Sequence, residues 1–279
     1  MLTAIRNRDN QKVIAPYEDK DKQGYRCQSC SEAVILNKGK VRCDYFRHHT
    51  LSNCANKGES VLHMKIKQAI YEQLISAFKS IKWIDLEYPI GNELRSDIYL
   101  QTGKGTKIAL EIQVSPLTVK ELYRRTSLYH KNAINVIWIL PFEEERFYPY
   151  WTAKEREMAG YRFEEGNFKR SEIKFKEYEL AIAKLTFNYL TFWDLTKEYS
   201  TSFLVMKLGK VYGEDSDFYD FNGDQVSFEG KLKKTVKSTK EFRNVTLNEF
   251  VPQEVDVYER GQLYEIPARH IMGFNEKRG

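Results

Sequence analysis

The chain has 279 residues, enough for one large domain or two small ones, and its 42% hydrophobic content predicts a folded core rather than global disorder. A net charge of +5 favours polyanionic partners only mildly, because basic and acidic residues are mixed along most of the chain. No apolar run reaches the length of a membrane span and the N-terminus has no apolar signal region, so we expect a cytoplasmic protein without a membrane span.

All four cysteines lie in the first fifth of the chain. A C-x-x-C pair, Cys27 and Cys30, is followed by Cys43, His48, His49 and Cys54. Without an export signal this clustering favours metal binding over disulfides, with a redox pair or reduced thiols as the alternative. Three thiolates and an imidazole suit structural Zn²⁺, which stabilises a segment too small for its own core. We predict zinc bound by Cys27, Cys30, His48 and Cys54, with Cys43 and His49 as alternative ligands.

Short strands are predicted around the cysteines, and a helix follows them. The pattern predicts one strand near Lys12–Ala15 and a hairpin of Ala33–Leu36 with Lys40–Arg42. Ser60 is a suitable N-cap for a helix that is expected to run to about Lys79. At a period of 3.6 residues, the apolar stripe of this helix consists of Ile66, Ile70, Leu74 and Ala77.

Continued toward the N-terminus, this stripe becomes polar at His63 and Glu59, and Lys67 lies at its edge. Charged groups that face a core need partners, because burying them unpaired is costly. We interpret Glu59 as a functional residue, with a carboxylate stabilised by the helix dipole as the alternative. For His63 taken alone, a hydrogen bond to a backbone carbonyl is the competing interpretation.

A strand at Trp83–Ile90 and a hairpin come next. The hairpin consists of Asp97–Leu100 and Lys107–Val114, joined by a Gly-rich turn. Because side chains on a strand alternate between two faces, Glu111 and Gln113 share a face, beside Asp97 on the neighbouring strand. Carboxylate and other oxygen ligands suit Mg²⁺. The alternative is an ordinary half-buried hairpin whose polar face meets water.

In the rest of the chain, the sequence pattern predicts that helices and strands first alternate and that an α+β region then follows. A helix at about Leu117–Lys131 presents a stripe of Val119, Leu122, Thr126 and Tyr129, and Asn135–Leu140 has the continuous apolar character of a buried parallel strand. Further on, we expect a partly helical linker at 142–160, a helix at 174–185, strands at 187–192, 202–208 and 225–228, an acidic loop at 214–224 and an exposed basic run at 231–240.

The order of helix, three strands, helix and strand, with its acidic residues, resembles the PD-(D/E)xK nuclease core. The strings C-x-x-C, FRH, Cys54 with GESVLH, RSDIYL, ALEIQVSPL, ELYRRTSLYH and VIWIL resemble the CoiA-like family of competence-associated nuclease-like proteins, over about Tyr25–Leu140. Two departures stand out. The family's His-Phe-x-His is Tyr45-Phe46-Arg47-His48 here, and the superfamily's E-x-K is Glu111-x-Gln113, so that Lys65 or Lys67 would have to supply the missing charge.

The resemblance implies a zinc knuckle before a restriction-endonuclease-like α/β domain that acts on DNA. We expect three parts: a knuckle segment at 1–57, a nuclease-like domain at 58–141 and a C-terminal α+β region at 142–279. The expected partners are DNA and recombination or competence proteins. The expected function is metal-dependent cleavage of DNA phosphodiesters during uptake, recombination or repair.

In this interpretation Asp97 and Glu111 hold Mg²⁺ or Mn²⁺, helped by Gln113 or the carbonyl of Ile112 and by Glu59 through water or a second ion. Lys67 orients the attacking water. Nucleic acid is contacted by His63, Arg124 and Arg125, although a solvated helix face explains the arginines equally well. Two other classes compete: an accessory DNA-binding protein with a decayed active site, and a zinc-dependent protein-interaction module, which leaves the Asp–Glu pair unexplained.

Overall fold

The computed structural model divides the chain into two units, Met1–Val114 and Ser115–Gly279. No described helix is long and apolar enough to cross a membrane. The described residues are 1–39, 43–49, 54, 59–147, 173–196, 203–209, 216–219, 225–228, 235–236, 238–253, 257–259, 262–264 and 271–274.

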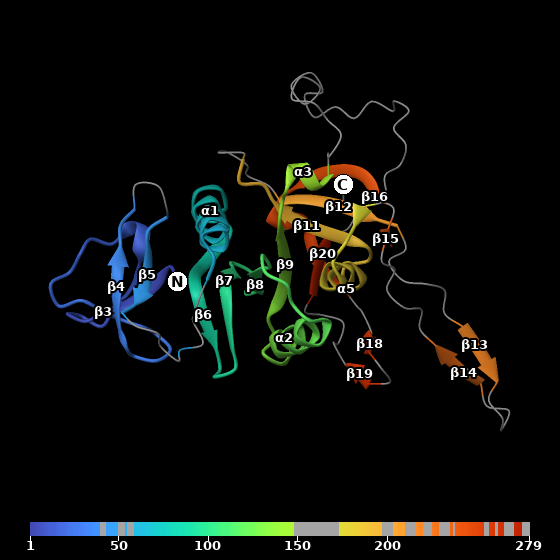
Figure 1. Cartoon of the computed structure of the whole chain (residues 1–279), viewed down its shortest axis with the longest axis horizontal. Helices are drawn as coiled ribbons and strands as arrows, with labels where there is room; N and C mark the ends of the chain where they lie inside the picture. Colours follow the sequence, from blue (N-terminus) through green and yellow to red (C-terminus); the bar gives the residue numbers. More distant parts are fainter. Residues whose placement is uncertain are drawn as a thin grey trace, which may run out of the picture. The chain divides into compact units, whose positions relative to one another are not determined.

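The first unit begins with a five-stranded antiparallel sheet (Figure 1). Its order is β2 (Lys12–Ile14), β1 (Thr3–Arg6), β3 (Tyr25–Arg26), β4 (Ala33–Asn37) and β5 (Tyr45–His48), and η1 (Ala15–Tyr17) follows β2. The prediction of one strand near Lys12–Ala15 missed its partner β1. The predicted strand at Ala33–Leu36 is confirmed, but β4 pairs with β5, and the predicted partner at 40–42 lies outside the described residues.

A helix and a three-stranded meander complete this unit. They are α1 (Val61–Ala77), β6 (Ile81–Ile90), β7 (Leu94–Thr102) and β8 (Lys107–Ile112), in which the neighbouring strands pair antiparallel. The Ser60 side chain accepts a hydrogen bond from the backbone N–H of His63 at 3.1 Å, so the predicted N-cap is confirmed. The cap fixes where α1 begins and so directs its first turn.

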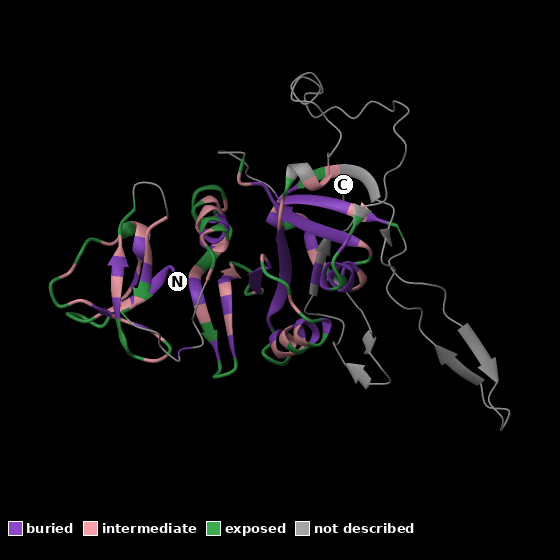
Figure 2. Ribbon diagram, viewed as in Figure 1, coloured by how far each residue is buried: buried purple, intermediate pink, exposed green. Residues whose placement is uncertain are grey.

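Burial of side chains corrects three details of the prediction (Figure 2). Ile66, Ile70 and Leu74 are buried as expected, but Ala77 is exposed because α1 ends there and the chain turns away. Lys67 is not at the edge of the stripe but fully buried. Every residue of β8 after Lys107 is buried, including Glu111, so the half-solvated hairpin is excluded.

The second unit starts with α2 (Val119–Lys131). Its predicted stripe of Val119, Leu122, Thr126 and Tyr129 is buried, as expected. The helix begins two residues later than predicted because Thr118 caps it, accepting from the backbone N–H of Glu121 at 3.1 Å. The apolar strand is confirmed as β9 (Asn135–Pro141), which is buried up to Leu140.

A mixed sheet surrounds β9 in this unit. β9 pairs parallel with β11 (Tyr189–Trp193) and, through one residue pair, with β20 (Ile271–Phe274), which itself pairs with β17 (Phe250–Gln253). β12 (Phe203–Leu208) joins β11 to β16 (Ser238–Val245). The helices are α3 (Glu144–Phe147) and α5 (Glu177–Leu185), and η2 (Leu247–Glu249) precedes β17.

Short strand pairs complete the described part of the second unit: β10 (Ile173–Lys174) with β15 (Thr235–Val236), β13 (Ser216–Tyr219) with β14 (Gln225–Phe228), and β18 (Val257–Glu259) with β19 (Gln262–Tyr264). The prediction of a loop over 214–224 was wrong for Ser216–Tyr219, which form β13 because β14 supplies a partner strand, and the rest of that range lies outside the described residues. Most of the predicted linker and half of the basic run lie outside the described residues. The protein is an α/β protein with mixed sheets.

Candidate active site and metal centre

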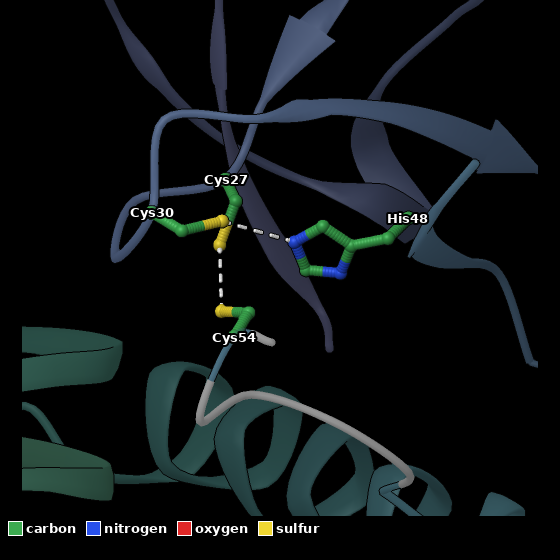
Figure 3. A group of neighbouring side chains, drawn as sticks. All are labelled: Cys27, Cys30, His48 and Cys54. Atoms are coloured by element: carbon green, nitrogen blue, oxygen red, sulfur yellow. Dashed lines mark hydrogen bonds between the residues drawn. The ribbon is translucent and has the colours of Figure 1, made fainter. Parts of the chain in front are cut away.

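The cysteine segment brings four side chains to one point (Figure 3). Cys27 and Cys30 come from the loop after β3, His48 ends β5 and Cys54 precedes α1. One ligand atom of each lies within 4.8 Å of the others. The Sγ atoms of Cys27 and Cys54 are 3.7 Å apart, and Cys30 Sγ is 3.2 Å from His48 Nε2.

This geometry fits a tetrahedral ion. Two sulfurs bound to Zn²⁺ at about 2.3 Å along tetrahedral directions lie about 3.8 Å apart, close to the observed separation of Cys27 and Cys54. Burial alone would raise the pKa of the Cys27 thiol, but the backbone N–H groups of Cys30 and Ser29 hold its pKa below the usual value. Such donors favour the thiolate that a metal requires.

The two alternative ligands do not join this group. Cys43 and His49 are both described, and neither belongs to the cluster of ligand atoms. The four cysteines are all described and none of them forms a disulfide, so no disulfide competes for the sulfurs. Cys27, Cys30, His48 and Cys54 are therefore the residues that could hold a metal ion such as zinc.

A second group of polar side chains lies where the first turns of α1 face the meander. Glu59 precedes the helix, His63 and Lys67 follow at intervals of four residues, and Asp97 comes from β7. His63 Nε2 is 3.0 Å from Asp97 Oδ2, and its Nδ1 is 3.6 Å from Glu59 Oε1. Ligand atoms of Glu59, His63 and Asp97 all lie within 4.8 Å of one another.

Lys67 lies at the centre of this group. Its ammonium donates to Glu59, to Glu87 Oε1 at 3.0 Å and to Asp97 Oδ1 at 3.4 Å. An ammonium has three protons to donate, so each carboxylate can take one. Because the lysine side chain is 0% exposed, these partners replace the water that it loses on folding.

The group holds its charges at neutral pH. Burial alone would lower the pKa of Lys67, but Glu87, Asp97 and Glu59 raise that pKa above its usual value. Burial would raise the pKa of Asp97, but His63, Lys67 and the backbone N–H of Ile112 hold it well below its usual range. Lys67 therefore remains an ammonium, which can donate hydrogen bonds and stabilise negative charge but cannot accept a proton.

Glu87 is a member of this group that the sequence pattern did not single out. It lies in β6 and is buried, and Lys67 and Arg95 hold its pKa below the usual value against the effect of burial. The sequence contains only an indirect signal for Glu87: a lysine on the inward face of a helix needs acidic partners. The pattern does not show which of several acidic residues on the meander would supply them.

Glu111 lies near this group by register. Ile98 pairs with Leu110, and one further step along the two strands sets Asp97 opposite Glu111. Opposite residues of an antiparallel pair point to the same face. Ile112 N–H donates to Asp97 Oδ2 at 2.9 Å, and Glu111 and Gln113 are buried. Glu111 is not in the group of ligand atoms within 4.8 Å, so its sharing of an ion with Asp97 stays a prediction.

The two arginines belong to the second unit. Arg124 makes a two-pronged ion pair with Glu121, at 2.7 and 2.8 Å, on the exposed side of α2. The guanidinium of Arg125 lies 5.2 Å from the centre of the Trp138 ring. Contacts of either side chain with nucleic acid therefore stay predictions.

We expect the Lys67→Met variant to lose about 3–5 kcal/mol of unfolding free energy at pH 7, because it leaves buried carboxylates without their counter-ion. Chemical denaturation checks this. Lys65→Met is the matched control, since Lys65 is exposed on the same helix and its loss should change stability by less than about 0.5 kcal/mol. Equal effects of the two substitutions would contradict the assignment.

Matches to known protein families cover more than half of the chain. Residues 8–57 match the N-terminal domain of competence protein CoiA, and residues 59–163 match its nuclease-like domain. No curated protein and no solved structure gave a significant match. The first match spans the cysteine cluster and the second begins at Glu59, the first residue of the carboxylate group. The chain therefore belongs to the competence protein CoiA-like family.

Proposed function

We propose that this protein is a metal-dependent DNA nuclease that cleaves phosphodiester bonds in DNA uptake, recombination or repair. The nuclease-like domain of its family supports a nuclease-like role in competence. The observation that carries the finer proposal is the position of Lys67. A lysine is missing two residues after Glu111, but the ammonium of Lys67 lies 3.4 Å from Asp97, from a different element.

The order of elements supports a PD-(D/E)xK type of core. α1, the meander β6–β7–β8, α2 and β9 follow one another as that resemblance implies. Acidic groups are supplied by the start of α1 and by two adjacent strands. The carboxylate oxygens of Asp97, Glu59 and Glu111 are hard ligands of the kind that Mg²⁺ and Mn²⁺ take.

In the proposed reaction, Asp97 and Glu111 would hold the divalent ion, with Gln113 or the carbonyl of Ile112 completing the protein's ligands. When bound, such an ion polarises the scissile phosphate and lowers the pKa of a coordinated water. For this role Lys67 would exchange one of its three carboxylate partners for the attacking water, which its ammonium would then orient. Its positive charge would stabilise the negative charge that develops on the phosphate. Glu59 holds the lysine from the helix side.

His63 is suited to meet the DNA backbone. Burial alone would lower its pKa, but Asp97 and Glu59 raise that pKa above its usual value, which favours the imidazolium. Its side chain keeps about a fifth of its surface exposed, unlike that of Lys67. A positive group at the rim of a carboxylate site offsets the repulsion between those carboxylates and phosphate. His63 would thus help an anionic substrate to approach.

The cysteine group is proposed to bind structural Zn²⁺. Its four ligands come from the antiparallel sheet and from the residue range just before α1, so the ion would tie these segments together. A closed set of four protein ligands leaves no open position for substrate, which is typical of a structural site.

An accessory DNA-binding protein with a decayed active site is the second candidate. The observation that favours it is the E-x-Q string, together with an ammonium already bound between Glu59 and Asp97. That ammonium competes with a metal ion for the same carboxylates. Crystals soaked in Mn²⁺ test the first candidate, because the absence of anomalous density beside Asp97 and Glu111 would contradict metal-dependent cleavage at these side chains.

The Gln113→Lys variant distinguishes an active site from a decayed one. If Lys67 already performs the role of the missing lysine, the new lysine should leave cleavage unchanged or reduce it, because a second ammonium repels the metal ion. If the site has decayed but its ligands still hold the metal ion, the variant should gain cleavage over the wild type. The assay is Mg²⁺- or Mn²⁺-dependent cleavage of single-stranded and duplex DNA, with Gln113→Met as the uncharged control of similar size.

A further inference from the structure

Glu87 has an unusual backbone conformation for a strand residue. Its φ is 52°, in the left-handed region that residues with a Cβ rarely adopt. It falls between Leu86, which pairs with Ile98, and Tyr88, which pairs with Ser96, so the register sets it opposite Asp97. Such a conformation persists only where the surrounding contacts determine it, and it is often found at functional sites.

The contacts that determine it come from the N-terminal sheet. Glu87 Oε1 accepts from the backbone N–H of Leu2 at 2.7 Å, and Oε2 accepts from the Thr3 hydroxyl at 2.7 Å and the Thr3 N–H at 3.3 Å. These residues are more than 80 positions away in the sequence. Both carboxylate oxygens are therefore engaged, one by Thr3 of β1 and the other by Leu2 just before it, which leaves Glu87 poorly placed to bind a metal ion.

The same contacts reach the cysteine cluster. Gln28 lies between Cys27 and Cys30, and its side-chain amide donates to the Thr3 hydroxyl oxygen. A hydroxyl can accept one hydrogen bond while donating another, so Thr3 can receive from Gln28 and donate to Glu87 at once. From the C-x-x-C loop, hydrogen bonds thus run through Gln28, Thr3 and Glu87 to the ammonium of Lys67.

This path ends at the group that the proposed reaction uses. Lys67 shares its protons among three carboxylates, and the N-terminal segment holds two of them. Glu87 is held by Leu2 and Thr3, and Glu59 forms an ion pair with the ammonium of Met1 at 3.3 Å. If Glu87 shifts, the ammonium is drawn toward Glu59 and Asp97, because an unpaired buried charge moves to its nearest partners. Its distance from the attacking water then changes as well.

We propose that Glu87 is a positioning residue for Lys67 and that Thr3 and Gln28 fix Glu87 from the cysteine loop. The knuckle then has a second task besides stabilising its own segment, since it sets the position of the lysine in the neighbouring site. The catalytic consequence rests on the proposed nuclease function, whereas the position of Lys67 can be measured without it.

The test replaces the links of this path while leaving all proposed metal ligands in place. Thr3→Val removes the hydroxyl at nearly constant volume, and Thr3→Ser keeps it. Gln28→Ala removes the first link at a half-buried position, and remains informative if Thr3→Val fails to fold. Ser29→Ala is the matched control in the same loop, because the backbone N–H that Ser29 donates to Cys27 is kept.

Three quantities are measured: zinc content, the Nζ and Cε chemical shifts of Lys67 in lysine-labelled protein, and cleavage of DNA. In Thr3→Val and Gln28→Ala we expect zinc content as in the wild type, a shifted Lys67 signal, and a fall in kcat of about tenfold to a hundredfold with KM nearly constant. Thr3→Ser and Ser29→Ala should resemble the wild type in all three.

An unchanged Lys67 signal in both Thr3→Val and Gln28→Ala would overturn the inference, even if these proteins were less stable. A wild type that cleaves no DNA would contradict the proposed function, but the Lys67 signal would still decide the inference. A Lys67 signal that is shifted in Thr3→Val but not in Thr3→Ser supports the inference in either case. The two variants differ in whether residue 3 keeps a hydroxyl group, so the shift would depend on that group and not on the packing of Thr3 alone.

Discussion

Asp97→Asn is expected to lower metal-dependent cleavage of DNA by about 10³-fold or more, because an amide no longer attracts the divalent ion and one stabiliser of the transition-state charge is lost. The amide oxygen can still accept from Ile112 N–H, which donates to Asp97 at 2.9 Å, so the backbone should keep its place. Binding of DNA should persist or tighten, since the change removes a negative charge that repels phosphate.

Glu111→Gln should behave in the same way if both carboxylates hold one ion. The matched control is Asp85→Asn, because Asp85 lies on β6 of the same meander and is paired with Lys12 rather than with Lys67. Cleavage rates, metal titrations and DNA affinity are measured for each variant. Cleavage by Asp97→Asn at the wild-type rate would refute the proposed active site. If Asp97→Asn lost cleavage while Glu111→Gln kept it, the metal ion would be held by Asp97 and its neighbours on α1 and not by Glu111.

Cys27→Ser should remove the metal ion from the cysteine cluster and unfold the N-terminal sheet. A structural zinc site supplies about 10 kcal/mol or more of apparent binding energy, which becomes folding energy when the segment has no large core. The core of this sheet includes Cys27 and Cys54 themselves, so losing the ion also leaves polar thiols among packed side chains. Serine is a poor substitute because its hydroxyl does not ionise near neutral pH.

Elemental analysis of protein purified without added metal should find one zinc per wild-type chain and none in Cys27→Ser. Limited proteolysis should then cut the variant within residues 1–54 while the wild type resists. Cys43→Ser is the control, since Cys43 lies outside the group of ligand atoms and its loss should leave the zinc in place. A wild-type protein that lacks zinc but keeps a protease-resistant N-terminus would refute the assignment.

Features that depend on nearby residues were predictable from the sequence. The N-cap at Ser60 and the buried stripe of α2 follow from short-range chemistry, because capping and helical periodicity involve residues within a few positions of one another. The apolar run at β9 is equally local. The errors occurred where an element ends or needs a distant partner: α1 stops at Ala77, and β13 became a strand because β14 pairs with it.

The ligand group around Cys27 was also predictable as a cluster, since C-x-x-C spacing and the chemistry of thiolates are properties of the sequence. The choice among the alternative ligands was not. Cys43 and Cys54 have the same chemistry, and only the pairing of β4 with β5 places His48 beside Cys30 while Cys54 reaches Cys27. That pairing depends on register and packing across the sheet, which no short string encodes.

By itself, the sequence determined which kinds of groups the protein offers: soft ligands near the N-terminus, carboxylates on two adjacent strands and basic residues on the first helix. Only the tertiary structure decided that Lys67, rather than Lys65, is buried among the carboxylates, and that Glu87 holds it. The physical reason is distance along the chain. Lys67 meets Asp97 across 30 residues and Thr3 meets Glu87 across 84, so their contacts arise from how helix and sheets pack, not from local pattern.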